Sequence, residues 1–472
     1  MERKIFLYNS AVIAGGLVLS KYAGAVPANS FPVVRIDPAQ RKFRSEAVEK
    51  AILEIEKNIP NKEIAWLFSN CFPNTLDTTV EFEMKNGKPD TYVITGDIDA
   101  MWLRDSTAQV WPYLPFARED KQLQLLIAGV VNRQVQNILY DPYANAFYKD
   151  RTKVGQWKND MTEMKPGIHE RKWEIDSLCY PVRLSYQYWK TLNDASVFDE
   201  NWSAAAKLII KTFRDQQRKN GKGPYKFERK TSWATDGVPL GGYGYPAKPV
   251  SLIFSMFRPS DDATIFPLFI PANFFAVVSL KQMGEIFSKV YKDADTSKEC
   301  FAFASEVETA IQKYGVIKHE RFGSVYAYEV NGHGSYNLMD DANVPSLLAL
   351  PYLGAVSASD PVYVNTRKLV LSEYNPFYFK GKAGEGIGGP HVGVDMVWPL
   401  SIIIRGLTSK DKNEIRQCVS TLQHAHGGTG FMHEAFHKED ASRFTRKWFA
   451  WANTLFGELV WKIYKEDPSL LG

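Results

Sequence analysis

The chain has 472 residues, of which 45% are hydrophobic and 23% are charged. These values are ordinary for a globular protein with a sizeable core, so they exclude a mainly disordered chain. The formal net charge is +4, from 57 basic and 53 acidic residues, and no stripe of Lys and Arg with interleaved aromatic residues occurs. Nucleic acid is therefore not an expected partner.

The N-terminus has the layout of a secretory signal peptide. Arg3 and Lys4 precede an apolar stretch at 11–20, and Ala23-Gly24-Ala25 follows as a small-residue cleavage site. The alternatives are a buried N-terminal helix or a membrane anchor, although the apolar run is too short to span a bilayer. We therefore expect residues 1–25 to direct export to a periplasm or out of the cell, with no stable membrane insertion after their removal.

Hydrophobic spacing favours helices along most of the chain. Leu123, Ile127, Val131 and Val135 recur every fourth residue, as expected for one buried helix face. Comparable patterns predict helices at 44–57, 174–192, 202–218, 272–291, 298–314, 361–373, 395–407, 410–425 and around 448–459. Strand signals are few and short.

Long connections separate these helices and are dense in Gly, Pro, Trp and acidic residues. They cover 86–105, 229–271, 321–345, 374–394 and 426–447. Ordering such loops is costly, so loops of this kind are usually functional. No linker divides the chain, and we predict a single catalytic domain over 26–472: an all-α toroid of helical hairpins with its loops at one end. An irregular α-solenoid is the alternative, but no repeat of fixed period occurs.

The run TGDIDAMWLRDSTAQVWPYLP at 95–115 concentrates polar and aromatic groups. Asp97, Asp99, Trp102, Arg104 and Asp105 fall within nine positions, where a strand-like run meets a helix. Carboxylates accept hydrogen bonds from sugar hydroxyls, and a guanidinium holds a carboxylate in a planar fork. The alternative is a helix N-terminus with capping Asp residues and an internal ion pair.

A second group of acids lies in FRPSDDA at 257–263. Asp261 and Asp262 are adjacent and repel each other, so one of them can keep its proton to a higher pH. A protonated carboxyl can act as general acid towards a leaving-group oxygen. An exposed pair of helix-capping acids is the alternative, although apolar and aromatic residues flank the pair on both sides.

The segment HEAFH at 433–437 fits the HExxH pattern of zinc peptidases. That mechanism needs both His residues on one helix face, and the nearby Gly427, Gly428 and Gly430 make a helix doubtful. Glu458 remains a conceivable third ligand. A zinc metallopeptidase is therefore one alternative function, and a non-catalytic exported glycan-binding protein is another.

Several of these segments together resemble glycoside hydrolase family 125. They are TGDIDAMWLRDSTAQVWPYL, KWEIDSLCYP, FRPSDDA, GGPHVG and MHEAF, in order from about residue 35 to the C-terminus. The resemblance implies an (α/α)6 barrel and an exo-acting, inverting α-mannosidase that prefers non-reducing α-1,6-linked mannose. It implies a mannose-containing oligosaccharide or glycan as partner and no metal or other cofactor.

The resemblance also assigns roles to residues. The general acid falls on Asp261, with Asp262 as the alternative in case of a one-residue misalignment, and the general base falls on Glu434. An inverting pair leaves room for a water, so we predict a carboxyl separation of roughly 6.5–9.5 Å. The remaining motif residues are expected around the terminal mannose: Asp97, Trp102, Arg104, Asp105, Arg258, Asp341 and His391.

Overall fold

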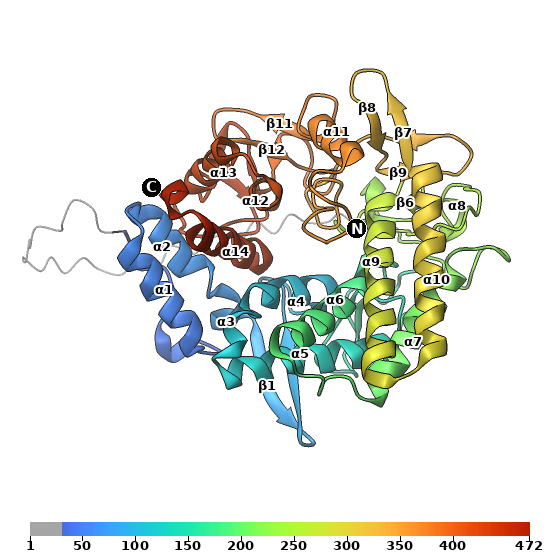
Figure 1. The fold of residues 1–472 in the computed structure, drawn as a ribbon, viewed down its shortest axis with the longest axis horizontal. Coiled ribbons are helices and arrows are strands. Elements are labelled where there is room, and N and C mark those ends of the chain that lie inside the picture. The colour runs from blue at the N-terminus through green and yellow to red at the C-terminus, as the bar shows by residue number, and fades with distance from the viewer. Residues whose placement is uncertain (1–30) are drawn as a thin grey trace, which may run out of the picture.

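The computed structural model describes residues 31–472, and Figure 1 shows their fold. Most of this part of the chain is helical. Its α-helices are α1 (Glu46–Asn58), α2 (Lys62–Cys71), α3 (Asn74–Thr78), α4 (Leu103–Val110), α5 (Lys121–Tyr140), α6 (Ile175–Leu192), α7 (Glu200–Asp215), α8 (Pro239–Gly242), α9 (Ile270–Ile286), α10 (Ala294–Ala310), α11 (Pro361–Val370), α12 (Pro399–Thr408), α13 (Lys412–His424) and α14 (Ala450–Glu466).

The helices are arranged as a ring (Figure 1). On the inner side, α4 packs against α14 and α6, α6 packs against α9, and α12 packs against α14. Between α9 and α12 the irregular segment 344–353 lies against α6 and α14. There Tyr180 Oη donates to the Val344 carbonyl at 2.8 Å and Tyr352 Oη donates to Glu458 Oε2 at 2.9 Å. Helices α5, α7, α10 and α13 pack on the outer side.

Most helix predictions agree with the structure. Side-chain caps mark several starts: Ser45 Oγ accepts from Val48 N before α1, and Asp120 Oδ1 accepts from Leu123 N before α5. The helix predicted at 395–407 begins only at Pro399, because residues 396–397 form a short strand instead. Helices α9 and α10 end in π-helical turns at Phe287–Tyr291 and Ile311–Gly315.

Six small antiparallel sheets lie in the connections between helices. Two-stranded pairs are β1 (Val80–Lys85) with β2 (Lys88–Val93), β7 (Val316–His319) with β8 (Gly323–Tyr326), and β11 (Tyr378–Lys380) with β12 (Glu385–Ile387). Three-stranded sheets join β3 (Met101–Trp102), β4 (Ala146–Phe147) and β5 (Ile168–Glu170); β6 (Leu268–Phe269), β9 (Glu329–Val330) and β10 (Tyr336–Asn337); and β13 (Met396–Val397), β14 (Ala435–His437) and β15 (Asp440–Thr445). The fold is thus mainly helical, with strands confined to the loops.

The two ends of the ring meet through backbone contacts. Ala450 N donates to the Thr95 carbonyl at 3.0 Å, and Gly96 forms an isolated bridge with Phe449. A Cβ at Gly96 would lie 2.3 Å from the Trp448 carbonyl oxygen, so the motif residue at position 96 must be glycine. The TGDID segment is therefore joined to the loop just before α14.

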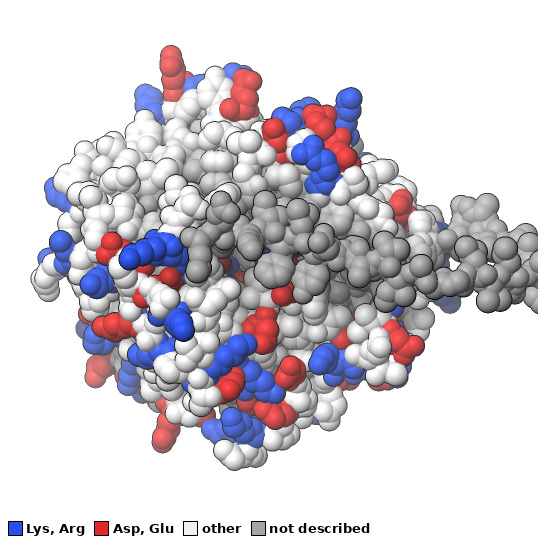
Figure 2. Space-filling view, turned by 180° about the vertical axis from the view of Figure 1, so that it is seen from behind, with Lys and Arg blue, Asp and Glu red and all other residues white. Residues whose placement is uncertain are grey.

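The main hydrophobic core includes residues from Ala47 to Leu471, which supports one continuous folding unit over the described chain. Its four cysteines are buried and unpaired. In residues 31–472 no helix is both long and apolar enough to cross a membrane. The predicted signal peptide at 1–25 lies outside the described residues. On the face seen in Figure 2, basic and acidic side chains are interspersed.

Candidate active site

A polar cavity of about 250 Å³ opens where the long loops meet. All five loops predicted to be functional contribute to its wall, through residues that include Trp102, Asp261, Asn343, His391 and Glu434. The complete lining is Thr95, Ile98, Trp102, Arg104, Asp105, Gln156, Trp157, His169, Glu170, Lys172, Asp236, Pro259, Ser260, Asp261, Asn343, His391, Trp398, Glu434, Arg446, Phe449 and Trp451.

Asp261 lies at the tip of a tight turn that points into this cavity. Arg258 N donates to the Asp262 carbonyl at 2.8 Å and Asp261 N donates to the Arg258 carbonyl at 2.9 Å. The turn forces Asp261 into the left-handed region with φ of 64°, which is unfavourable for a residue with a Cβ. The buried ammonium of Lys172 supports this conformation, since its Nζ donates to the Asp261 carbonyl at 2.7 Å. The backbone strain is thus compensated by specific contacts.

The two adjacent acids of FRPSDDA have different surroundings. The Asp261 side chain is 20% exposed and faces the cavity, whereas that of Asp262 is 2% exposed and is absent from the cavity wall. Asp262 instead accepts hydrogen bonds from Thr235 Oγ1 at 2.7 Å and Ser260 Oγ at 3.0 Å. Only Asp261 is therefore in a position to meet a ligand in the cavity.

Arg104 is surrounded by carboxylates. Its guanidinium contacts Glu174 Oε2 at 2.6 Å, Asp176 Oδ2 at 3.1 Å, Asp261 Oδ1 at 3.0 Å and Asp105 Oδ2 at 3.5 Å. One positive charge cannot neutralise four carboxylates in a buried environment, so this cluster retains protons.

Burial favours the protonated forms of the acids around Arg104. Burial raises the pKa of Asp105 and that of Asp176 to about 6 each, although Arg104 acts in the opposite direction on both. Burial also raises the pKa of Glu174 well above its usual range. Burial acts the same way on Asp261, but Arg104 and a hydrogen bond from Glu174 outweigh it and lower the pKa of Asp261.

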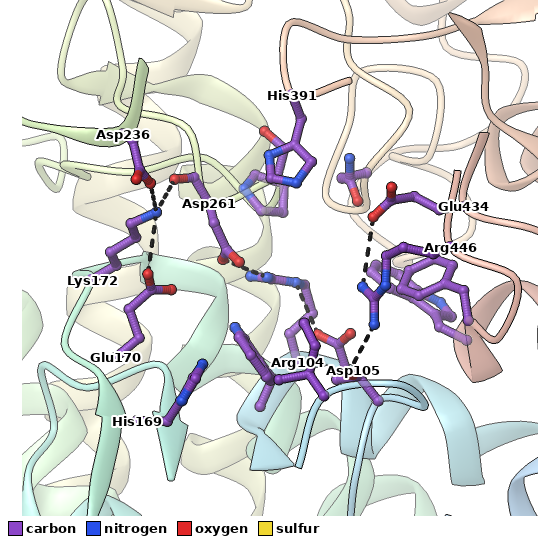
Figure 3. A pocket seen from close by; sticks show the side chains of 18 of the residues that line it. Arg104, Asp105, His169, Glu170, Lys172, Asp236, Asp261, His391, Glu434 and Arg446 are labelled. Carbon is purple, nitrogen blue, oxygen red and sulfur yellow. Dashed lines mark hydrogen bonds and ion pairs between the residues drawn. The ribbon is translucent and has the colours of Figure 1, made fainter. Parts of the chain in front are cut away.

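Glu434 lies on the opposite wall of the cavity from Asp261 (Figure 3). It directly precedes β14, and its Oε1 is 3.6 Å from Arg446 Nη1. Arg446 is in turn held by Asp97, whose Oδ1 accepts from Arg446 Nε at 2.9 Å. Asp97 does not line the cavity itself, so it acts on the cavity by holding Arg446 in place.

His391 lies on the cavity wall next to both acids (Figure 3). Its Nδ1 is 3.7 Å from Asp262 Oδ1. Burial disfavours the charged imidazolium, but Asp262, with smaller contributions from Glu434 and Asp261, outweighs it and raises the pKa of His391 to about 9. His391 is therefore a cation at neutral pH, close to the carboxylates on both walls.

A buried network of charges forms the wall on the far side of Asp261 (Figure 3). Lys172 Nζ donates to Asp236 Oδ1 at 2.7 Å and lies 3.4 Å from Glu170 Oε1. Arg229 pairs with both acids, and its guanidinium stacks 3.7 Å from the ring centroid of Trp157. This network fixes the cavity wall on the side of Asp261 away from Glu434.

Two indole groups offer hydrogen-bond donors to a ligand. Trp102 Nε1 and Trp398 Nε1 are buried, line the same cavity and have no hydrogen-bond partner among the described residues. Buried polar groups are normally hydrogen-bonded, so these two donors are candidates for a hydrogen bond to a water or a ligand in the cavity. Flat rings with a polar edge also suit sugar faces.

Arg258 and Asp341 lie behind the cavity wall. Arg258 Nε donates to Glu329 Oε1 at 2.7 Å, and both side chains are buried. Asp341 Oδ1 accepts from the backbone and side-chain nitrogens of Asn343, which does line the cavity. Trp102, Arg104, Asp105 and His391 are thus the predicted binding residues that line the cavity.

The HEAFH segment does not form a helix. Residues 435–437 are strand β14, and the His433 ring stacks on Phe444 with centroids 3.6 Å apart. The two imidazoles are consequently not one helical turn apart, as the zinc-peptidase arrangement requires. In residues 31–472 no group of three or more His, Cys, Asp and Glu side chains has the arrangement of a metal site.

The sequence analysis missed most of one side of the cavity. Gln156, Trp157, His169, Glu170 and Lys172 all come from the connection between α5 and α6, which was not predicted as a functional loop, although Lys172 begins the motif KWEIDSLCYP. Its density of charged and aromatic residues was the available signal. Arg446 was also missed, because its role depends on a partner 349 positions away.

Comparison with known proteins gives extended matches. The family model described as metal-independent alpha-mannosidase (GH125) matches residues 61–461. The meiotically up-regulated gene 157 protein of Schizosaccharomyces pombe is 43% identical over 458 residues, which cover 93% of this chain and 90% of that protein.

Solved structures match as well. A metal-independent alpha mannosidase from Streptococcus pneumoniae, in a non-productive substrate complex with alpha-1,6-mannobiose, is 40% identical with a TM-score of 0.86 and covers 90% of this chain and all (100%) of that chain. A bacterial glucoamylase complexed with acarbose is 14% identical with a TM-score of 0.51, covering 87% of this chain and 55% of its own. The second likeness extends to the fold alone.

Proposed function

Because the chain belongs to the metal-independent α-mannosidase family GH125, we propose that it is an exo-acting, inverting enzyme that releases terminal α-1,6-linked mannose. Family membership supports α-mannosidase activity in general. The linkage and a mannose-containing oligosaccharide or glycan as substrate are supported by the Streptococcus pneumoniae relative, which was solved with alpha-1,6-mannobiose.

The observation that supports this function most is the placement of two carboxylates. Asp261 and Glu434 reach one small cavity from opposite walls. In an inverting hydrolase, one carboxylic acid protonates the leaving oxygen while a carboxylate on the other face of the sugar activates water. We assign the acid to Asp261, because Asp262 is absent from the cavity wall, and the base to Glu434.

The remaining walls suit one terminal sugar. The indoles of Trp102 and Trp398 carry hydrogen-bond donors, and the carboxyl group of Asp105 carries an acceptor. The volume of the cavity is small, about 250 Å³. A closed pocket that accepts a single sugar is what exo action requires. The charged wall with Lys172 and Asp236 then faces the sugar on the leaving side.

Two further assignments belong to this proposal. The inner ring forms an (α/α)6 barrel, and this barrel is a single catalytic domain. Its members are α4, α6, α9, the segment 344–353, α12 and α14. A crystal structure with α14 detached from α4 would contradict this assignment. Residues 1–25 are a signal peptide for export to a periplasm or out of the cell. N-terminal sequencing of the exported protein tests this, and an intact Met1 there would contradict it.

The direct test is hydrolysis of defined α-1,2-, α-1,3- and α-1,6-linked mannobioses by the purified protein, followed by proton NMR. We expect free mannose from the α-1,6 dimer, formed first as the β-anomer. The same rate in the presence of a chelator is expected for a metal-independent enzyme. First release of the α-anomer would contradict inversion, and binding without release of mannose would favour the glycan-binding alternative.

A further inference from the structure

The proposed general acid is in an environment that opposes its task. Asp261 must hold a proton before it can protonate the glycosidic oxygen. Yet its Oδ1 accepts from Arg104 Nη2 at 3.0 Å and from Asn145 Nδ2 at 3.3 Å, and both contacts stabilise the ionised form. A second group must therefore supply the proton.

Glu174 is the group with the necessary geometry. Its side chain is fully buried and shares two partners with Asp261, because the Arg104 guanidinium and Asn145 Nδ2 contact both carboxyl groups. Its Oε2 already accepts from Arg104 Nη1 at 2.6 Å and from Ser177 Oγ at 2.8 Å. Its Oε1 has one long contact, 3.4 Å from Asn145 Nδ2, and is therefore the oxygen with room for a proton.

We propose that Glu174 is the proton store of the catalytic acid, so that Glu174 and Asp261 share one proton that rests on Glu174 in the free enzyme. This inference rests on the proposed function. When substrate fills the cavity, the O–H bond of Glu174 breaks and an O–H bond forms on Asp261. Asp261 then passes that proton to the glycosidic oxygen as its bond to the anomeric carbon breaks. Glu174 is left as a carboxylate paired with Arg104 and regains a proton from solvent after product release.

The charges around the pair favour this exchange. Arg104 stabilises whichever carboxylate is ionised, because it contacts both. Further titratable groups face the pair from α4, β5, the segment before α6, α6 and the 374–394 loop. They are Asp105, His169, Glu170, Lys172, Asp176 and His391. Glu174 does not line the cavity, so it acts through Asp261 and is a positioning residue.

Asp176 provides a matched control. It is fully buried like Glu174 and contacts the same Nη1 atom of Arg104, at 3.1 Å. Asn145 Nδ2 contacts both Glu174 Oε1 and Asp261 Oδ1, at 3.4 and 3.3 Å, whereas the carboxylate of Asp176 accepts its hydrogen bond from Arg104. A purely structural role in holding Arg104 would therefore give E174Q and D176N the same kinetic pattern.

The experiment compares two substrates, α-1,6-mannobiose and a 2,4-dinitrophenyl α-mannoside, whose leaving group needs no proton. General acid catalysis contributes about 10²–10⁴-fold, so we expect E174Q to lower kcat/KM for mannobiose by at least ~100-fold and for the aryl mannoside by less than ~10-fold. In E174Q the alkaline limb of the mannobiose profile also moves to lower pH, since only Asp261 can then hold the proton. D176N should lower both rates by one common factor.

Equal losses on both substrates in E174Q would overturn the proposal. If E174Q does not fold, the wild-type protein labelled with ¹³C at the glutamate δ-carbons gives the answer: a proton store requires a protonated glutamate carboxyl at neutral pH, and its absence overturns the inference. Failure of the proposed function is distinct, because the wild-type protein would then release no mannose from mannobiose. If wild-type and D261N behave as expected while E174Q resembles D176N, only the proton store is wrong.

Discussion

Lys172 Nζ donates hydrogen bonds to the Asp261 carbonyl and to Asp236 Oδ1, each at 2.7 Å. The side chain of Lys172 is only 2% exposed, so one buried ammonium joins the backbone of the proposed acid to the charged wall beside it. The conformation of Asp261 consequently depends on a residue 89 positions earlier in the chain.

Replacing Lys172 by Met should therefore affect both stability and activity. Breaking a buried ion pair leaves an uncompensated charge, and we expect a loss of about 3–5 kcal/mol in the free energy of unfolding. The Asp261 turn also loses its support, so kcat for mannobiose should fall. Urea denaturation and steady-state kinetics measure the two effects.

The control for Lys172 is Lys165, which pairs with Asp141 at 3.2 Å but is 44% exposed. K165M should cost no more than about 1 kcal/mol, because Lys165 is exposed to solvent and Arg171 still pairs with Asp141 at 2.9 Å. Equal stability of K172M and K165M would show that the buried network is not needed for the fold.

Asp261 and Asp262 should respond differently to amide substitution. D261N removes the proposed acid, so we expect mannobiose hydrolysis to fall by about 10²–10⁴-fold while an activated aryl mannoside is largely spared. D262N keeps the acid but removes the negative charge that holds His391. Its activity should therefore fall by a similar factor on both substrates. If D262N instead lost activity on mannobiose and kept it on the aryl mannoside, Asp262 rather than Asp261 would be the acid.

Glu434 should be needed for every substrate. Its proposed role is to activate water, which no leaving group can replace, so E434Q should lower kcat on mannobiose and on the aryl mannoside alike by about 10²–10⁴-fold. Glu439 provides the control, since it lies in the turn between β14 and β15 and outside the cavity. If E434Q retained full activity on either substrate, another residue would have to be the base.

His391 should make stability depend on pH. Its pKa is raised in the folded state from 6.5 to about 9, so its contribution is fully present below pH 6.5 and is lost as the pH rises through 9. The free energy of unfolding should decline over this window in the wild-type protein and decline less in H391Q. The control is H424Q, at the end of α13. The same slope in wild type and H391Q would contradict a charged His391.

The TGDID motif contains its own matched pair. Asp97 anchors Arg446, which lines the cavity, while Asp99 pairs with Lys153 at the surface and is 72% exposed. Loss of a charged hydrogen bond costs about 1.5–3 kcal/mol, so D97N should weaken binding of mannose by about tenfold or more. D99N should bind mannose like the wild type. Isothermal titration calorimetry with mannose measures both constants.

Periodicity and loop composition predicted most of the fold. The spacing of apolar residues located α1, α5, α6 and α9, and Gly- and Trp-rich loops located five of the segments that form the cavity. Helix α2 was missed because it is only 10 residues long, although Ile64, Leu67, Phe68 and Cys71 follow helical spacing. The spacing of apolar residues is sufficient to predict a helix where one helix face is buried, and it is a weak signal elsewhere.

The site was less accessible to sequence reasoning, because its chemistry depends on distant pairs. The residues of TGDIDAMWLRDST did gather at the cavity, but Asp97 reaches it only through Arg446. No spacing rule connects Lys172 to the carbonyl of Asp261 or Glu174 to its carboxyl. Arg258 has the charge expected of a residue that binds a sugar, yet its guanidinium is paired with the buried Glu329.

The joining of Thr95 and Gly96 to Phe449 and Ala450 determines when the protein becomes active during its synthesis. A ribosome delivers Arg104 and Asp261 long before Glu434, Arg446 and α14. Until α14 docks on α4, the nascent chain holds one wall of the cavity without the other. Both walls of the cavity are therefore in place only after the C-terminal part of the chain has been made and α14 has docked.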